Sequence, residues 1–264
     1  MSAHEHNRRA WDAMVHRKQR FARPASDDDF ATNIKELDPR GWLGDVRAKQ
    51  VLCLAAGGGR QGPIYAAAGA SVTVVDISAA QLELDREVAA ERGIDLRTVQ
   101  TSMDDLSMFK PGEFDLVIQP VSTCYLPDIR LTYQQVARAT RVGGIYVSQH
   151  KQPTSLQSAT EATTSGYEIT TPYYHEDPLP PVVGSLHREE GTLEFLHRWE
   201  QLIGNMCQSG FVVEDLSEPL HAKNDASRNS FAHRSQFVPP YVRIKARRVG
   251  ETEGQDQKQS PIVF

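Results

Sequence analysis

Cysteine is scarce in this chain, with three residues among 264. Cys53, Cys124 and Cys207 lie far apart, and they form neither a CxxC pair nor the spacing of a zinc site. They therefore suggest no disulfide framework, and no metal is expected. Cys53 and Cys207 lie in apolar segments, where small buried thiols are expected. Unpaired thiols are typical of a reducing compartment, so we expect a cytoplasmic location.

Long hydrophobic runs are also missing, and no segment has the length that spans a membrane. The first residues, MSAHEHNRRAWDAM, lack the apolar core of a signal peptide. Charge of one sign does not dominate either, since the formal net charge is −5. The short basic run at 243–248 alternates with apolar residues, which predicts a solvated edge strand. Neither a nucleic-acid partner nor a membrane partner is expected, and the oligomeric state is left open.

What the chain does have is a regular alternation of strand and helix patterns from residue 50 onward. Buried parallel strands are predicted at 51–56, 71–76, 96–99, 114–118 and 145–148, with helices at 60–70, 78–93 and 129–140. Ser78-x-x-Gln81 is a capping box, and Gly93 is a helix stop. Two more strands follow at 211–213 and 241–246. The pattern predicts an α/β fold with a doubly wound, seven-stranded, mostly parallel sheet.

The segments outside this alternation suggest additions to the sheet. Residues 5–20 predict an amphipathic helix, and residues 21–44 predict irregular chain. Residues 151–190 are rich in Thr, Ser, Pro and Tyr and are too long for an ordinary connection, which predicts an inserted cap over the active face. A helix is predicted at 192–209. The tail, residues 250–264, is predicted to be disordered.

The most informative stretch is the glycine loop, VLCLAAGGGRQGP, which starts at Val51. Missing side chains indicate that something approaches the backbone closely. A phosphate-binding P-loop needs Lys and Ser or Thr after its last glycine, whereas Pro63 follows Gly62 here. Gly57-x-Gly59-x-x-Gly62, with Asp76 at the end of the next strand, is compatible with a dinucleotide or with any adenosine cofactor.

S-adenosylmethionine (SAM) needs two more features: an adenine clamp after the third strand, and an exit from the fourth strand that faces the methyl group. The sequence offers SMDDL at 102–106 and FDLVIQP at 114–120. Over about residues 7–150 the chain resembles the small-molecule branch of the class I SAM-dependent methyltransferases, those related to ubiquinone and menaquinone biosynthesis enzymes. The resemblance is carried by five motifs in order: VLCLAAGGGRQGP, VTVVDIS, QTSMDDLSMF, FDLVIQPVSTCYLPD and VARATRVGGIYV.

This resemblance implies a cofactor site. The loop would wrap the methionine part of SAM, Asp76 would accept hydrogen bonds from the ribose, and Ile77 and Met103 would sandwich the adenine. A leading segment, residues 1–45, would cover a methyltransferase domain at 46–249. The implied cofactor-binding residues are Trp11, Ala55, Ala56, Gly57, Gly59, Gln61, Asp76, Ile77, Ser102, Met103, Asp104 and Gln119.

The chain also departs from the family pattern. Cys53 and Ala55 stand where the family usually has an acidic residue and a glycine, and Ser102 stands where Asp is common. These departures leave open a SAM-binding relative without catalytic turnover. A nicotinamide-dependent oxidoreductase is the other alternative, and it rests on the GxGxxG loop alone.

If the acceptor atom is a hydroxyl or a thiol, a nearby base assists by removing its proton. Tyr125 follows the fourth strand and His150 ends the fifth, which makes them the candidate catalytic residues. The predicted cap adds Tyr173, Tyr174 and His175. The aromatic cap favours a small, partly apolar acceptor, with O-, C- and S-methylation all left open.

Overall fold

The computed structural model describes residues 1–19, 22–32 and 34–250. Its strands are β1 (Gln50–Leu54), β2 (Ser71–Asp76), β3 (Arg97–Gln100), β4 (Phe114–Gln119), β5 (Thr140–Lys151), β6 (Phe211–Ser217) and β7 (Tyr241–Arg248). Its helices are α1 (Ala3–His16), α2 (Asp27–Thr32), α3 (Ile34–Leu37), α4 (Gln61–Ala67), α5 (Ala79–Arg92), α6 (Arg130–Ala139), α7 (Pro153–Gln157), α8 (Asn205–Gln208) and α9 (Phe231–Arg234). A 3-10 turn, η1 (Thr123–Tyr125), follows β4, and a π-helical turn, η2 (Glu200–Gly204), precedes α8.

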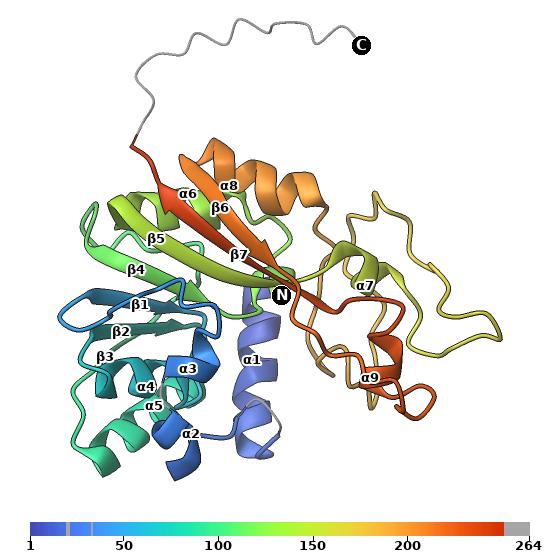
Figure 1. Ribbon diagram of the computed structural model, residues 1–264, viewed down its shortest axis with the longest axis horizontal. Coiled ribbons are helices and arrows are strands. Elements are labelled where there is room, and N and C mark those ends of the chain that lie inside the picture. Colours follow the sequence, from blue (N-terminus) through green and yellow to red (C-terminus); the bar gives the residue numbers. More distant parts are fainter. Residues whose placement is uncertain (20–21, 33, 251–264) are drawn as a thin grey trace, which may run out of the picture.

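The strands form one seven-stranded sheet in the order β3-β2-β1-β4-β5-β7-β6 (Figure 1). β1 to β5 are parallel, and β7 runs antiparallel to both β5 and β6. The predicted mostly parallel, doubly wound sheet is therefore confirmed. The basic strand is not at an edge, because β7 lies between β5 and β6; the prediction of a solvated edge strand was wrong.

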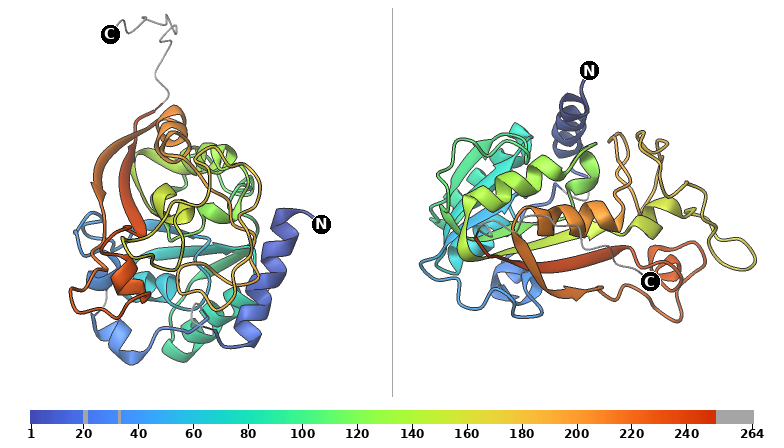
Figure 2. Two further views of the ribbon diagram at one scale, coloured as in Figure 1. Left: turned by 90° about the vertical axis from the view of Figure 1, so that its right-hand side faces the viewer. Right: turned by 90° about the horizontal axis from the view of Figure 1, so that it is seen from above.

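Both faces of the sheet are covered, which explains the continuous apolar run of β1. Leu52 and Leu54 point to the layer that contains Tyr133 of α6, whereas Val51 and Cys53 point to the layer that contains Tyr65 of α4. Figure 2 shows helices on both sides of the sheet. A strand buried on both faces has no solvent side and therefore shows no polar alternation.

The predicted capping box and glycine stop lie at the two ends of α5. The hydroxyl of Ser78 accepts the backbone N–H of Gln81 at 3.1 Å, and Gly93 ends α5 in the left-handed conformation. The segment 21–44 is more regular than predicted, since it contains α2 and α3. Cys207 of α8 is exposed rather than buried.

The helix predicted at 192–209 begins later, with η2. Residues 192–198 form no helix because their backbone bonds to other segments: Phe195 N–H donates to the carbonyl of Cys124 at 2.7 Å, and the carbonyl of Glu194 accepts from Leu179 N–H at 2.7 Å. Tertiary pairing overrides the helical pattern there.

Residues 158–198 carry little regular structure and extend beyond the end of the sheet near α7 and α9 (Figure 1). The predicted disordered tail is residues 250–264, of which residues 251–264 lie outside the described residues. No helix in the described part of the chain is both long and apolar enough to cross a bilayer.

Candidate cofactor and acceptor site

A cavity of about 750 Å³ lies at the carboxyl ends of β1, β2, β4 and β5. The strand order reverses at β1: β2 and β3 lie on one side of it in the sheet, and β4 and β5 lie on the other. Open α/β sheets bind ligands at such a switch point. The volume lies within the range of roughly 300–1,000 Å³ typical of small-molecule sites. All but three of the fourteen predicted site residues line the cavity; the exceptions are Gly59, Asp104 and His150.

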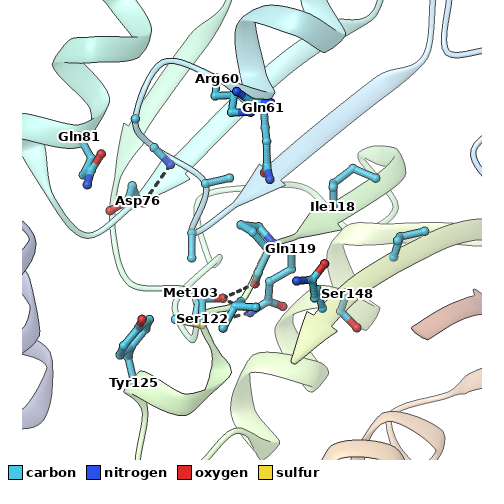
Figure 3. A pocket seen from close by; sticks show the side chains of 18 of the residues that line it. Arg60, Gln61, Asp76, Gln81, Met103, Ile118, Gln119, Ser122, Tyr125 and Ser148 are labelled. Carbon is cyan, nitrogen blue, oxygen red and sulfur yellow. Dashed lines mark hydrogen bonds between the residues drawn. The ribbon is translucent and has the colours of Figure 1, made fainter. Parts of the chain in front are cut away.

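Asp76 ends β2 and fixes two loops at once. One carboxylate oxygen accepts the N–H of Gly57 at 3.0 Å, and the other accepts the N–H of Ser78 at 2.9 Å (Figure 3). Burial raises the pKa of Asp76 to about 6, although these backbone donors act in the opposite direction. An ionised carboxylate has further lone pairs, so Asp76 can still accept from hydroxyls in the cavity.

The glycines of the loop are required by close packing against neighbouring parts of the protein. A Cβ on Gly57 would lie 2.7 Å from the Cβ of Gln81, and one on Gly59 would lie 2.8 Å from the carbonyl oxygen of Leu84. A Cβ on Gly62 would lie 2.4 Å from a methyl of Val74. The sequence indicated a close approach to the backbone. At these three glycines, α5 and β2 make that approach, so the loop can pack beneath the cavity.

A buried carboxyl supports the same loop from below. Asp85 of α5 is 0% exposed, and one of its oxygens accepts the N–H of Gly58 at 2.9 Å. Burial raises the pKa of Asp85 to about 7. The sequence analysis missed this residue, because an acidic residue inside a helix gives no sign of being buried.

Two amide oxygens in the cavity wall have no hydrogen-bond partner among the described residues. They belong to Gln61 of α4 and Gln81 of α5, and both side chains line the cavity with Asp76 (Figure 3). Unpaired buried acceptors are costly unless a ligand supplies donors. Two amide acceptors and a carboxylate, beside the apolar side chains of Ile77 and Met103, fit a ligand with hydroxyl and ammonium donors and an apolar ring. These residues fit SAM.

The predicted adenine-reading residues divide into two groups. Ser102 and Met103 line the cavity, whereas Asp104 lies behind it and bonds to His4 at 2.9 Å. Gln119 lines the cavity, but its amide is fully used within the protein. Its nitrogen donates to Ser122 at 2.8 Å and contacts the sulfur of Met103 at 3.2 Å, and its oxygen accepts from Tyr146. Gln119 therefore lines the cavity while its amide is held by the protein, and its predicted contact with the cofactor stays a prediction.

The far side of the cavity holds Tyr125 of η1 and Trp11 of α1, whose rings meet edge to face with centroids 5.4 Å apart. The Tyr125 hydroxyl donates to Glu189 at 2.7 Å, and Glu189 also bonds to Lys151 at 2.5 Å. Burial raises the pKa of Tyr125 well above its ordinary value. Burial alone would raise the pKa of Glu189, but Lys151 outweighs it and lowers that pKa. The sequence analysis missed Glu189, whose segment carries no motif.

His150 is 0% exposed and lies behind the cavity wall. Its ring nitrogens share hydrogen bonds with the hydroxyls of Thr123 at 2.9 Å and Ser148 at 2.8 Å. Burial, together with nearby His197, lowers the pKa of His150 to about 3. The geometry gives it a positioning role, since Ser148, and not His150, faces the cavity.

The predicted cap contributes one residue to the cavity, Glu189. The rings of Tyr173 and Tyr174 meet edge to face outside it, and His175 lines a separate, smaller cavity. These three side chains, named as further candidates for a base, do not line the cavity.

Helix α1 is docked across the site by buried polar contacts. The side-chain amide of Asn7 donates to the carbonyls of Tyr125 and Leu193 at 2.9 and 3.0 Å and accepts the N–H of Leu193 at 2.7 Å. Asp12 accepts the hydroxyl of Ser78 at 2.6 Å. These contacts hold the Trp11 ring in the cavity wall. Helix α1 itself lies beside the carboxyl ends of the parallel strands (Figure 1).

The sheet order and the glycine loop joined to a β2 carboxylate define a Rossmann-like protein that binds a nucleoside cofactor. A family model described as a methyltransferase domain matches residues 52–148. The chain is 33% identical over 228 residues to the uncharacterized methyltransferase YbaJ of Bacillus subtilis, covering 81% of this chain and 89% of that protein. The chain belongs to the class I SAM-dependent methyltransferases, and SAM is its cofactor.

Two further similarities concern methyltransferases whose names state a reaction. The ubiquinone biosynthesis O-methyltransferase of Cronobacter sakazakii is 32% identical over 101 residues, covering 38% of this chain and 42% of that protein. The geranyl diphosphate C-methyltransferase of Streptomyces coelicolor A3(2) superposes with a TM-score of 0.60 at 17% identity, covering 94% of this chain and 99% of that chain. The structural likeness shows a shared fold.

Proposed function

We propose that this methyltransferase acts on a small, partly apolar acceptor that binds in the same cavity as SAM. The observation that carries the proposal is the continuity of the cavity from Asp76, past Met103, to Tyr125 and Ser148. SAM, when bound, supplies an electrophilic methyl group on a sulfonium, which is transferred by in-line displacement. The protein aligns the reactants and excludes water.

The residues around the acceptor end divide into apolar walls and a few polar groups. Trp11, Val121 and Val147 offer apolar surface, and Tyr125 and Glu189 offer polar atoms. Tyr125 keeps its proton because its pKa is high, so it orients rather than deprotonates. Glu189 has a lowered pKa, so it is ionised at neutral pH, and it is the carboxylate beside Tyr125 that can receive a proton from an acceptor hydroxyl.

The cofactor is tested by calorimetry with SAM and with NAD. We expect SAM to bind and NAD not to bind; the reverse would favour the oxidoreductase alternative. Methyl transfer is tested by incubating the protein with tritiated SAM and a panel of phenols, thiols and apolar acids. Binding of SAM without transfer to any member would favour the non-catalytic alternative.

The acceptor end is tested with Tyr125→Phe, Glu189→Gln and His150→Ala in the same assay. We expect Glu189→Gln to lower turnover of a hydroxyl acceptor most, by about 10²-fold. Unchanged turnover in Glu189→Gln and Tyr125→Phe would show that neither side chain takes part.

A further inference from the structure

The cavity continues away from the glycine loop along β4, β5 and β7, beneath residues 37–42. We call this part the β7 end of the cavity. Its walls are mainly apolar and aromatic: Leu37, Pro39, Trp42, Tyr65, Ile118, Val147 and Tyr241. At this end the guanidinium of Arg243 lines the cavity among these side chains.

Arg243 is half-buried and held in one orientation. Its Nε donates to the side-chain oxygen of Gln149 at 2.7 Å, across the β5–β7 pairing. Among the described residues no carboxylate lies within ion-pair distance of it. Asp38 is nearby, but its two oxygens accept the N–H groups of Trp42 and Leu43 at 2.9 and 2.8 Å.

The other cations on this face of β7 share a carboxylate partner. Lys245 pairs with Glu214 at 3.0 Å, and Arg247 pairs with the same carboxylate. Burial lowers the pKa of Arg243, partly offset by Tyr65 and Asp38, yet a guanidinium stays charged at neutral pH. Arg243 is thus a desolvated cation whose two terminal nitrogens are available to an anion.

We propose that Arg243 binds an anionic group, a carboxylate or a phosphate, carried by the methyl acceptor. This inference rests on the proposed function and names the acceptor class as an apolar molecule with one acidic end. A guanidinium held through Nε offers its outer edge as a fork, which matches two oxygens of a carboxylate or phosphate. The apolar walls at this end then contact the body of the acceptor.

The carboxylate of the cofactor's methionine is a poorer match for Arg243. Arg23 and Arg60 line the cavity at the glycine loop, and of these Arg60 already pairs with Asp29 at 2.6 Å. The backbone next to Arg23 is joined to that loop by Ala25 N–H, which donates to the carbonyl of Gly59 at 2.9 Å. Arg243 lies on a strand three positions from β1 in the sheet, or roughly 14 Å at about 4.8 Å per strand. The two ends of the cavity therefore have separate cations.

Calorimetry on the enzyme saturated with S-adenosylhomocysteine tests this. The probes are benzoate and phenyl phosphate, with benzyl alcohol as the uncharged comparison. We expect one or both anions to bind at least tenfold more tightly than benzyl alcohol. The better anion tells whether a carboxylate or a phosphate is preferred. Arg243→Met should remove that preference and leave the affinity for S-adenosylhomocysteine within twofold of wild type.

Lys245→Met is the matched control, because it removes the same charge two residues further along the same face, and it should keep the preference for anions. Arg243→Lys retains the charge without the fork, so its affinity for the anionic probes should lie between those of wild type and Arg243→Met. It replaces Arg243→Met in the test if that variant is unstable.

Equal binding of all three probes, or anion binding retained in Arg243→Met, would overturn this inference and leave the proposed function unaffected. Loss of S-adenosylhomocysteine binding in Arg243→Met would also overturn it, by assigning Arg243 to the cofactor. Failure of wild type to bind S-adenosylhomocysteine would contradict the cofactor site and the inference with it.

Discussion

The carboxylate of Asp76 accepts the backbone N–H of Gly57 at 3.0 Å, so the side chain expected to hold the ribose also shapes the glycine loop. The same carboxylate accepts the N–H of Ser78 at the start of α5. One residue therefore joins β2, the loop after β1 and the helix after β2. A change at Asp76 is expected to alter both the contacts and the shape of the cofactor site.

Asp76→Asn should weaken SAM binding by about 30-fold. The amide has one acceptor oxygen instead of two, and its NH₂ group faces a backbone N–H. Losing hydrogen bonds to a charged acceptor costs about 2 kcal/mol, and 1.4 kcal/mol is a factor of ten in affinity. Calorimetry with SAM measures the change. Asp105→Asn is the control, because that carboxylate is exposed and bonds to Ser107 outside the cavity. Equal losses in both variants would contradict a direct role for Asp76.

The affinity for SAM should also depend on pH through Asp76. Burial raises its pKa to about 6, and protonation removes the negative charge and one of the oxygen lone pairs to which the ribose hydroxyls donate. Affinity should therefore be constant above pH 7 and should fall about tenfold per unit below pH 6. Asp76→Asn should lose this dependence. Asp85 titrates nearby with a pKa of about 7, so Asp85→Asn measured in parallel separates the two carboxyls.

The same raised pKa determines whether the free energy of unfolding of the ligand-free protein rises or falls with pH. The folded state holds a proton on Asp76 up to about pH 6, whereas the ordinary value is 3.8. The folded state therefore binds more protons between about pH 4 and pH 6, and the contribution of Asp76 to the free energy of unfolding decreases as pH rises through that window. Urea denaturation of wild type and Asp76→Asn at pH 4.5 and pH 7 measures it.

Ala55→Gly should stabilise the protein. Ala55 has φ +48°, in the left-handed region that a Cβ disfavours by roughly 1–2 kcal/mol. Glycine costs more entropy in the unfolded chain, so a net gain of about 0.5–1 kcal/mol is expected. The neighbouring Ala56→Gly is the control: that residue has no positive φ, and the change should destabilise. Thermal unfolding of both variants without cofactor decides; a lower midpoint for Ala55→Gly would contradict the strain.

Much of the cofactor half of the site could be predicted from the sequence. Strand periodicity locates the end of β2, and the Ser78 cap locates the start of α5. A short loop that follows a parallel strand must lie where the carboxyl ends of the strands meet. Residues that act through backbone position, such as Gly57 and Asp76, are therefore placed by the fold. The hydrogen bond that joins Gly57 N–H to the carboxylate of Asp76 was not predicted, because no local pattern indicates it.

The acceptor half could not be predicted in the same way, because its residues come from segments whose position depends on tertiary contacts. Glu189 reaches the cavity from a stretch with no regular pattern. Arg243 alternates with apolar residues just as it would on a solvated edge, and only the strand order shows that β7 is internal. His150 follows a strand as expected and shares a face of β5 with Ser148, yet its ring is buried against the hydroxyls of Thr123 and Ser148 and does not line the cavity.

Lys151→Met should destabilise the protein strongly. Lys151 is 5% exposed and bonds to Glu189 and Glu194, which would be left as buried carboxylates with too little positive charge. Breaking a buried ion pair by removing one partner costs about 3–5 kcal/mol. Urea denaturation measures this loss of stability. The control is Lys245→Met, which removes one partner of a partly exposed ion pair. Adding Glu189→Gln to Lys151→Met should restore part of the loss; no restoration would contradict a charge effect.

Arg234→Met should loosen the segment after α7. Arg234 of α9 is 1% exposed, and its guanidinium donates to the carbonyls of Ser155, Ser158 and Ala159 at 2.7, 3.0 and 2.9 Å. The substitution leaves these carbonyls without their donor, at a cost of about 3 kcal/mol. Because the contacts join α9 to residues 155–159, we expect faster limited proteolysis within residues 158–190 as well as lower stability to urea.

Arg228→Met is the matched control for this last change. Its side chain is exposed, although it also donates to carbonyls of the same segment, those of Ala162 and Thr163. Exposed carbonyls can bond to water instead, so the proteolysis rate should change little. If both variants are cleaved at the wild-type rate, burial of the Arg234 guanidinium does not hold the segment in place. If both are cleaved equally faster, contact with the segment matters more than burial does.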